Sequence, residues 1–189
     1  MKLNFLTRQQ KQRGFTLVEV MIVIAILGSA IAVFFYFGGN IRKGNQANNT
    51  AVALNGMVEK ARTSFAGQFS AISATTLNQA GIVYKPFQYD SATTSITDPW
   101  GNTVTLNGSA TSLAMVIGGT LAMTADQCVT IAKTLINTAA KINVGTGVTA
   151  TAGVISGGSA YFTSPTETQA NLTAGCSATA PLIGAQFNP

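Results

Sequence analysis

The side chains able to do chemistry in this sequence are few, and their types exclude most enzyme mechanisms. The chain of 189 residues contains 6 acidic and 11 basic residues, 2 Cys and no His. A Ser-His-Asp triad, a Cys-His pair, a His-ligated zinc ion and an HExxH site are therefore excluded. Two Cys are too few for a zinc knuckle or an iron–sulfur cluster. The sequence thus predicts no catalytic residue, no metal site and no cofactor.

One carboxylate lies in an unusual place, at the beginning of a long apolar segment. Residues 20–40, which follow Glu19, carry no charge. A carboxylate buried in apolar surroundings is destabilising unless it has a partner. Thr16 and Glu19 also match a capping box, in which Glu19 only supports the start of a helix. These residues alone leave both interpretations open.

The element that carries Glu19 is predicted to be a membrane-spanning helix. About 20 uncharged residues at 1.5 Å per residue cover the roughly 30 Å hydrocarbon core of a bilayer. The apolar core of a cleaved secretory signal is shorter, about 7–15 residues. Four of the 11 basic residues fall within residues 1–14, where no acid occurs. This asymmetry predicts a cytoplasmic N-terminus and a remainder on the other side of the membrane.

The basic character of the chain belongs mostly to residues 1–14. The remaining residues carry 7 basic side chains against 6 acidic ones, and the basic ones are scattered. A nucleic-acid-binding domain needs a clustered basic face, so no nucleic-acid partner is predicted.

A second, amphipathic half of the same helix is expected over residues 41–65. Its apolar residues recur at spacings of three and four, and they are Ala47, Ala51, Leu54, Val58, Ala61 and Phe65. Gly38, Gly39 and Gly44 each weaken a helix by about 1 kcal/mol relative to Ala. We therefore expect a bend or a locally melted stretch between the two halves.

The remainder, residues 66–189, is predicted to be an α+β head with an antiparallel sheet packed on the long helix. Residues 66–98 are expected to be an irregular loop with at most a short helix, and residues 98–101 a turn. Asn107-Gly108 predicts a hairpin turn between strands at 103–106 and 113–117. Thr124 and Gln127 predict the capping box of a helix. Later strands are expected at 148–155, 160–162 and 182–187.

The N-terminal constellation resembles the class III signal of type IV prepilins. The shared features are a basic leader, Gly14, the apolar residue Phe15, and Glu19 four residues further on. The resemblance implies a pilin αβ-roll, a leader peptide at 1–14 that is cleaved after Gly14, and N-methylation of Phe15. It also implies that Glu19 pairs with the Phe15 amino group of a neighbouring subunit and sets the filament register. The implied partners are the prepilin peptidase/methyltransferase, an inner-membrane assembly platform and further copies of the chain.

The two ends of the chain resemble different branches of this superfamily. The short leader and Phe15 are similar to type IVa pilins. The segments 96–101, 126–128 and 175–187 are similar to type IVb pilins such as toxin-coregulated and bundle-forming pilins, which implies a last strand near the centre of the sheet.

The only two cysteines, Cys128 and Cys176, form either one bridge or two buried thiols. An exported chain can oxidise them, and a bridge over about 50 residues contributes roughly 4 kcal/mol in the chain-entropy model. The resemblance to type IV pilins favours the disulfide, which bounds residues 128–176 in the head.

The sequence therefore predicts a structural subunit of a type IVb-like pilus. Its precursor would reside in the inner membrane with a periplasmic head, and the assembled filament would be extracellular. Residues 98–101 are also similar to a segment of type II secretion pseudopilins, so a pseudopilin of a secretion or competence system is the alternative. A membrane-anchored periplasmic enzyme or binding module is a more remote one.

Overall fold

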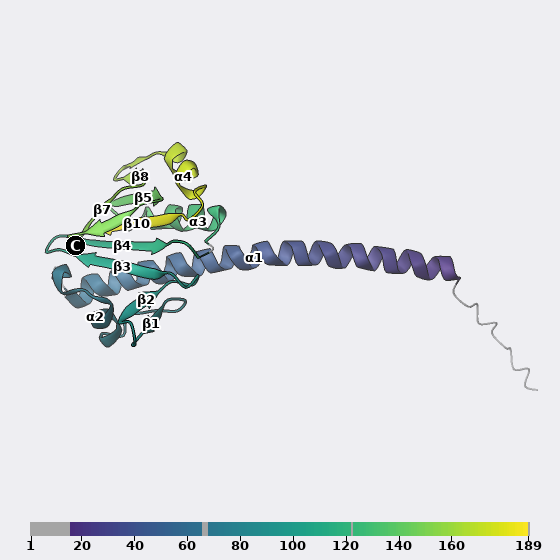
Figure 1. Ribbon diagram of the computed structural model, residues 1–189, viewed down its shortest axis with the longest axis horizontal. Coiled ribbons are helices and arrows are strands. Elements are labelled where there is room, and N and C mark those ends of the chain that lie inside the picture. Colours follow the sequence, from purple (N-terminus) through teal and green to yellow (C-terminus); the bar gives the residue numbers. More distant parts are fainter. Residues whose placement is uncertain (1–15, 66–67, 122, 189) are drawn as a thin grey trace, which may run out of the picture. The chain divides into compact units, whose positions relative to one another are not determined.

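The structure is a computed structural model that describes residues 16–65, 68–121 and 123–188 (Figure 1). Contacts divide the chain into two compact units, Met1–Ile41 and Arg42–Pro189. We call the second unit the head. Helix α1 (Leu17–Phe65) contributes residues to both units, and it ends at the residue that the apolar periodicity predicts. The fold class is confirmed as α+β, with the C-terminal half of α1 packed on an antiparallel sheet.

Helix α1 keeps its helical conformation across Gly38, Gly39 and Gly44, so the prediction of a melted stretch is wrong. Each glycine lacks a side chain but still supplies both backbone hydrogen-bonding groups. The cost of about 1 kcal/mol per glycine is spread along a helix of 49 residues. Nothing lies within 4 Å of where a Cβ would be at these positions, so no neighbour forces a break.

The head adds short helices and ten strands to α1. The helical elements are η1 (Phe69–Ala71), α2 (Ala74–Gln79), α3 (Ala125–Leu135) and α4 (Gln169–Cys176). The first five strands are β1 (Gln88–Asp90), β2 (Ser95–Thr97), β3 (Thr103–Gly108), β4 (Leu113–Gly118) and β5 (Lys141–Gly145). The others are β6 (Thr149–Thr151), β7 (Val154–Ser156), β8 (Ser159–Thr163), β9 (Thr166–Glu167) and β10 (Leu182–Phe187).

Eight strands form one antiparallel sheet in the order β1-β2-β3-β4-β10-β5-β8-β9. Strand β10 lies between β4 and β5, where Ile183 is opposite Ile117 on one side and Val144 on the other. The predicted insertion of the last strand near the centre of the sheet is confirmed. Figure 1 shows β10 in yellow between the teal β4 and the green β5.

The two faces of this sheet are covered by different elements. One face packs against α1 and α3, because Met115, Ile142 and Ala185 share a single buried cluster with the apolar stripe of α1. The other face lies under the β6–β7 hairpin. There the backbone of Gly184 is so close to Val148 and Ile155 of the hairpin that a Cβ would touch both side chains. Strands β4, β5 and β10 are therefore buried on both faces.

Several local predictions are confirmed. The side chains of Thr124 and Gln127 form the predicted capping box at the start of α3. The apolar stripe of α1 is buried from Ala47 to Ala61, and Phe65 is partly buried against the same core.

The hairpin turn predicted at Asn107-Gly108 is wrong. Both residues lie within β3, and the turn is made by residues 109–112. The Ser109 hydroxyl accepts the N–H groups of Thr111 and Ser112 and stabilises that turn. Gly108 serves a different purpose, because a Cβ there would overlap the carbonyl of Phe69.

Candidate polymerisation site

Helix α1 begins at a cap formed by Thr16. The Thr16 hydroxyl accepts the N–H of Glu19 at 3.3 Å, and the Thr16 carbonyl accepts the N–H groups of Glu19 and Val20 at 3.0 and 3.2 Å. Glu19 thus occupies the third position of the helix, where the local capping interpretation placed it. Gly14 and Phe15, the predicted cleavage and methylation sites, lie outside the described residues.

The Glu19 side chain lies on the surface of the first turn of α1. Among the described residues Glu19 forms no ion pair, whereas Glu59, on the same helix, contacts Arg62 at 2.7 Å. A negative charge in the first turn interacts favourably with the helix dipole, by about 0.3–1 kcal/mol. The carboxylate is free to accept a cationic partner from outside the described residues.

Exposed apolar side chains cover the N-terminal half of α1, and we call those from Leu17 to Ile41 the apolar sleeve. Large apolar side chains from Leu17 to Ile41 are exposed, and their exposed fractions run from 45% at Val20 to 79% at Phe34. This is the one helix in the described part of the chain that is long and apolar enough to cross a membrane. A soluble monomer rarely exposes an apolar patch larger than a few hundred Å². The sleeve therefore needs lipid or other protein chains around it.

The head is fastened internally by a disulfide between Cys128 on α3 and Cys176 at the end of α4. Their Cα atoms are 5.6 Å apart, and 48 positions separate them in sequence. Both cysteines are buried, with exposed fractions of at most 1%. The two residues that the resemblance paired are thus bonded in the structure.

A buried carboxylate, Asp98, organises the turn predicted at residues 98–101. Its Oδ1 accepts the N–H groups of Trp100 and Asn102 at 3.0 and 2.8 Å, and its Oδ2 accepts the N–H of Gly118 at 3.0 Å. The Asn102 side chain donates to the same carboxylate. Asp98 joins the turn to the end of β4, a role that its place in the sequence did not reveal.

Two glutamines hold this region to the first turns of α1 in the head. Gln46 donates from Nε2 to the carbonyl of Pro99 at 3.3 Å. Gln127 of α3 donates from Nε2 to the carbonyl of Lys43 and to the side chain of Gln46, both at 3.1 Å. The turn, α3 and the start of the head helix therefore form one hydrogen-bonded unit.

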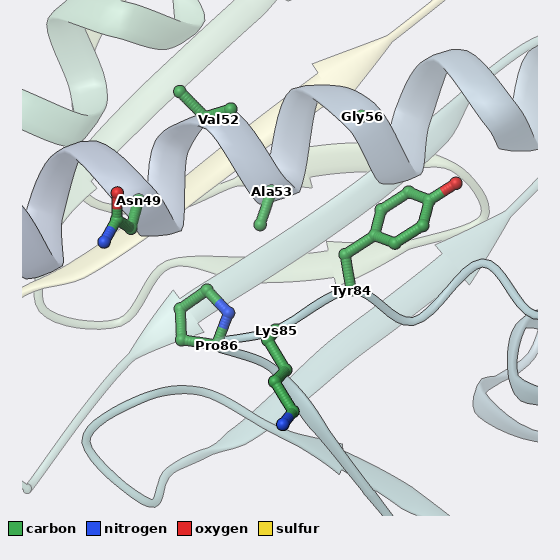
Figure 2. A pocket seen from close by; sticks show the side chains of 7 residues that line it. All are labelled: Asn49, Val52, Ala53, Gly56, Tyr84, Lys85 and Pro86. Atoms are coloured by element: carbon green, nitrogen blue, oxygen red, sulfur yellow. The ribbon is translucent and has the colours of Figure 1, made fainter.

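A groove of about 490 Å³ lies between α1 and the segment before β1. Figure 2 shows Val52, Ala53 and Gly56 of α1 on one side, with Tyr84 and Pro86 on the other. Its lining is mostly apolar, and Lys85 is its single charged residue. An ammonium and a phenol without a carboxylate or a second base do not make a catalytic pair. No cluster of three potential metal ligands occurs among the described residues.

Two side chains in the head have shifted pKa values with ordinary structural causes. The hydrogen bond from the Thr93 hydroxyl, followed by that from the Ala92 N–H, lowers the pKa of Asp90. Burial, followed by the nearby charge of Glu167, raises the pKa of Tyr161. Neither arrangement places an acid beside a base in a cavity.

A known sequence motif covers the N-terminal segment of the chain. A family model described as the prokaryotic N-terminal methylation motif matches residues 9–35. The chain carries a prokaryotic N-terminal methylation motif. The match includes Gly14, Phe15 and Glu19, so the predicted resemblance to type IV prepilins is confirmed at this end of the chain.

A solved pilin structure is similar to part of this chain. The crystal structure of TcpA, a type IV pilin from Vibrio cholerae El Tor biotype, matches with a TM-score of 0.48 and 16% sequence identity. The match covers 77% of this chain and 99% of that one. No curated protein sequence is significantly similar to this chain.

Proposed function

We propose that the chain is the major structural subunit of a type IV pilus of the IVb kind. It polymerises through α1 into an extracellular filament used for adhesion, aggregation or mating. The observation that carries the proposal is the methylation motif together with the exposed apolar sleeve that follows it. The sleeve first occupies the inner membrane and then the filament core, because both environments remove its apolar surface from water.

Maturation follows from the motif. A prepilin peptidase/methyltransferase removes the leader 1–14 and methylates Phe15. Residues 15–40 then form the membrane and filament-core half of α1, residues 41–65 its head half, and residues 66–189 the rest of the periplasmic head. An assembly platform in the inner membrane lifts the subunit into the growing filament.

Glu19 sets the register of that assembly. Its carboxylate is exposed among apolar side chains and has no ion pair in the described residues. When neighbouring sleeves pack together, this charge is buried, and an unpaired buried charge is destabilising by several kcal/mol. The new Phe15 ammonium of a neighbouring subunit is the group of opposite charge that maturation creates close to Glu19 in sequence.

A pseudopilin of a type II secretion or competence system is the second candidate, since the same motif serves both uses. The turn at residues 98–101 favours it, whereas the disulfide favours the pilus. An enzyme anchored by α1 is the weakest alternative, because the groove in Figure 2 offers no acid–base pair. Quantifying this chain in sheared surface filaments separates the first two, because a pilus contains it as the bulk component.

The decisive variant is Glu19→Gln, with Glu59→Gln as the matched control on the same helix. Glutamine can replace glutamate in a capping box but carries no charge. We expect Glu19→Gln to insert into the membrane and fold its head normally, yet to yield few filaments or filaments with altered helical symmetry. Glu59→Gln removes an exposed ion pair with Arg62 and should assemble normally.

Filament counts by electron microscopy and helical symmetry by image reconstruction give the result. Normal filaments from Glu19→Gln as the only subunit would show that Glu19 acts only as a helix cap. Mass spectrometry of assembled filaments tests maturation independently. It should find Phe15 as the first residue with one added methyl, and a chain that still begins with Met1 would contradict it.

A further inference from the structure

Beside the turn that Gln46 holds to α1, the head exposes an apolar pair. Leu121 is 50% exposed, and in the described part of the head only Val52 and Val154 are other large apolar side chains classed as exposed. Trp100, the single tryptophan of the chain, is partly exposed. A Cβ added to Gly101 would lie 3.4 Å from the Leu121 side chain, so Leu121 packs against the Trp100-Gly101 turn. We call Trp100, Gly101 and Leu121 the base patch.

The base patch is fixed to the first turns of α1 in the head. Asn102 holds the backbone of Leu121 from both sides, donating to its carbonyl at 3.1 Å and accepting its N–H at 2.9 Å. The adjoining Pro99 carbonyl accepts a hydrogen bond from Gln46. The position of the base patch is therefore set by residues 43–46 of the helix and does not depend on a free loop.

Chain length places this anchor close to the bilayer surface. Gln46 is six residues beyond Asn40, where the uncharged segment closes. Six helical residues span about 9 Å, and even a fully extended chain would span only about 20 Å. The headgroup layer adds about 5–8 Å to each side of the hydrocarbon core. The anchor of the base patch therefore stays within about 20 Å of the hydrocarbon core whenever the sleeve spans the membrane.

The charges around the anchor fit an anionic surface. Arg42 and Lys43 are both exposed. The Asp98 carboxylate is 4% exposed and occupied by N–H donors, so it offers little repulsion. Asp126, in the first turn of α3, is exposed and opposes the two basic residues. These three side chains leave a net charge of +1 on the turns of α1 and α3 to which the base patch is joined.

We propose that the base patch, with Arg42 and Lys43, is a lipid-binding surface that docks the head onto anionic phospholipid before the subunit enters a filament. Tryptophan and basic residues are the side chains that favour the membrane interface. The indole N–H of Trp100 is buried and has no hydrogen-bond partner in the described residues. A small outward turn of the ring toward lipid phosphate or carbonyl oxygens gains a hydrogen bond and breaks none. The proposal rests on the membrane insertion assumed in the proposed function.

Trp100 is itself the reporter for the test. The full-length chain is reconstituted into vesicles of phosphatidylcholine alone or mixed with phosphatidylglycerol, with and without a headgroup-attached nitroxide lipid. Docking should shift Trp100 emission to the blue, expose it to nitroxide quenching and protect it from acrylamide, most strongly in the mixed vesicles. Protease protection of the sleeve reports insertion separately.

Matched variants test whether the change in Trp100 fluorescence depends on the base patch and on Arg42 and Lys43. Leu121→Ser should abolish quenching by the nitroxide, whereas Val154→Ser, an equally exposed apolar residue on β7, should not. Arg42→Gln with Lys43→Gln should lower the ratio of docked to undocked heads in mixed vesicles about fivefold per charge, since each basic residue contributes about 1 kcal/mol at such a surface. Equal thermal unfolding of all variants shows that the head remains folded.

Each other outcome overturns the proposal. An inserted sleeve with Trp100 open to acrylamide and insensitive to nitroxide refutes docking but leaves the proposed function intact. A sleeve that does not insert refutes both. A Leu121-dependent shift that grows with protein concentration in detergent, without lipid, assigns the base patch to a second copy of the chain.

Discussion

The two halves of α1 differ both in apolar content and in surroundings: 19 of the 25 residues 17–41 are apolar, but only 9 of the 24 residues 42–65. From Leu17 to Ile41 the apolar side chains are exposed, whereas Ala47, Leu54 and Val58 in the head are at most 1% exposed. The head half is one layer of a complete core that includes α3 and one face of the sheet. Among the described residues of its own unit, the N-terminal half has no such partner. One continuous helix thus has one half that packs in the core of the head and another half whose apolar surface is exposed.

The pattern of residues explains the difference. In the head half, apolar residues recur every three or four positions and Asn48, Asn49 and Glu59 lie between them, so one face is buried and the other is solvated. In the N-terminal half, apolar residues occur all round the helix. A helix that is apolar on every side needs lipid or several protein neighbours.

Removing residues 1–41 gives the largest contrast. The core of the head lies within residues 47–187, so residues 42–189 should fold as a soluble monomer without detergent. The complete chain should partition into detergent or lipid. Size-exclusion chromatography and circular dichroism measure both. An aggregated or unfolded 42–189 fragment would show that the head depends on the N-terminal half for stability.

Breaking the disulfide should destabilise the head and leave the sleeve unaffected. Cys128→Ser with Cys176→Ser opens a loop with a sequence separation of 48, and the loss in unfolding free energy should be about 4 kcal/mol. Denaturant titration of the 42–189 fragment measures the loss. Cleavage after Gly14 should continue at the normal rate, and a change in that rate would show that the two units are coupled.

The next largest effect is expected at Asp98. Asp98→Ala leaves three backbone N–H groups without their acceptor and removes one of the two acceptors of the Asn102 amide, which should cost about 3 kcal/mol. The exposed Asp126→Ala is the control and should cost below about 1 kcal/mol. Thermal unfolding distinguishes them. Equal unfolding temperatures for both variants would mean that water replaces the lost acceptor.

The smallest effect concerns Asp90, whose pKa lies below its ordinary value of 3.8 mainly because of the Thr93 hydroxyl. A lowered folded-state pKa stabilises the head above the unfolded-state value, and this contribution is lost as the pH falls through the folded-state pKa. Thr93→Val should therefore raise the pKa of Asp90 and lower stability slightly at neutral pH but not in strong acid. Carboxyl NMR titration measures the pKa, and an unchanged value would contradict the assignment.

The elements predicted best from the sequence have strong local signals. Phe65 ends a stripe with a regular period, and Thr124 with Gln127 forms a capping box that needs no tertiary partner. Strand β5 was missed because its alternation of polar and apolar residues extends only from Lys141 to Val144. In the structure its polar side chains face the hairpin and its apolar side chains face the core. Helix α4 was missed because it lacks an amphipathic pattern and its Thr168 forms no side-chain cap.

The candidate site likewise has one part that can be predicted from the sequence and another that depends on the fold. The motif around Gly14 and Glu19 is contiguous in sequence, so it is recognisable without a structure. The roles of Asp98 and Asn102 depend on Gly118 and Leu121, about 20 residues later, which meet them only in the folded head. The segment 66–98, expected to be an irregular loop, contains η1, α2, β1 and β2. The sequence does not predict them because each is too short to produce a periodic signal.

The central place of β10 determines the order in which the strands of the sheet can pair. Strands β4 and β5 do not pair with each other; both pair with β10, which follows all the other strands in sequence. During synthesis, seven strands of this sheet are available before β10 arrives and joins their two groups, which are β1 to β4 and β5 with β8 and β9. The eight-stranded sheet therefore closes only after residues 182–187 are available, and a head that lacks them remains as two unjoined groups of strands.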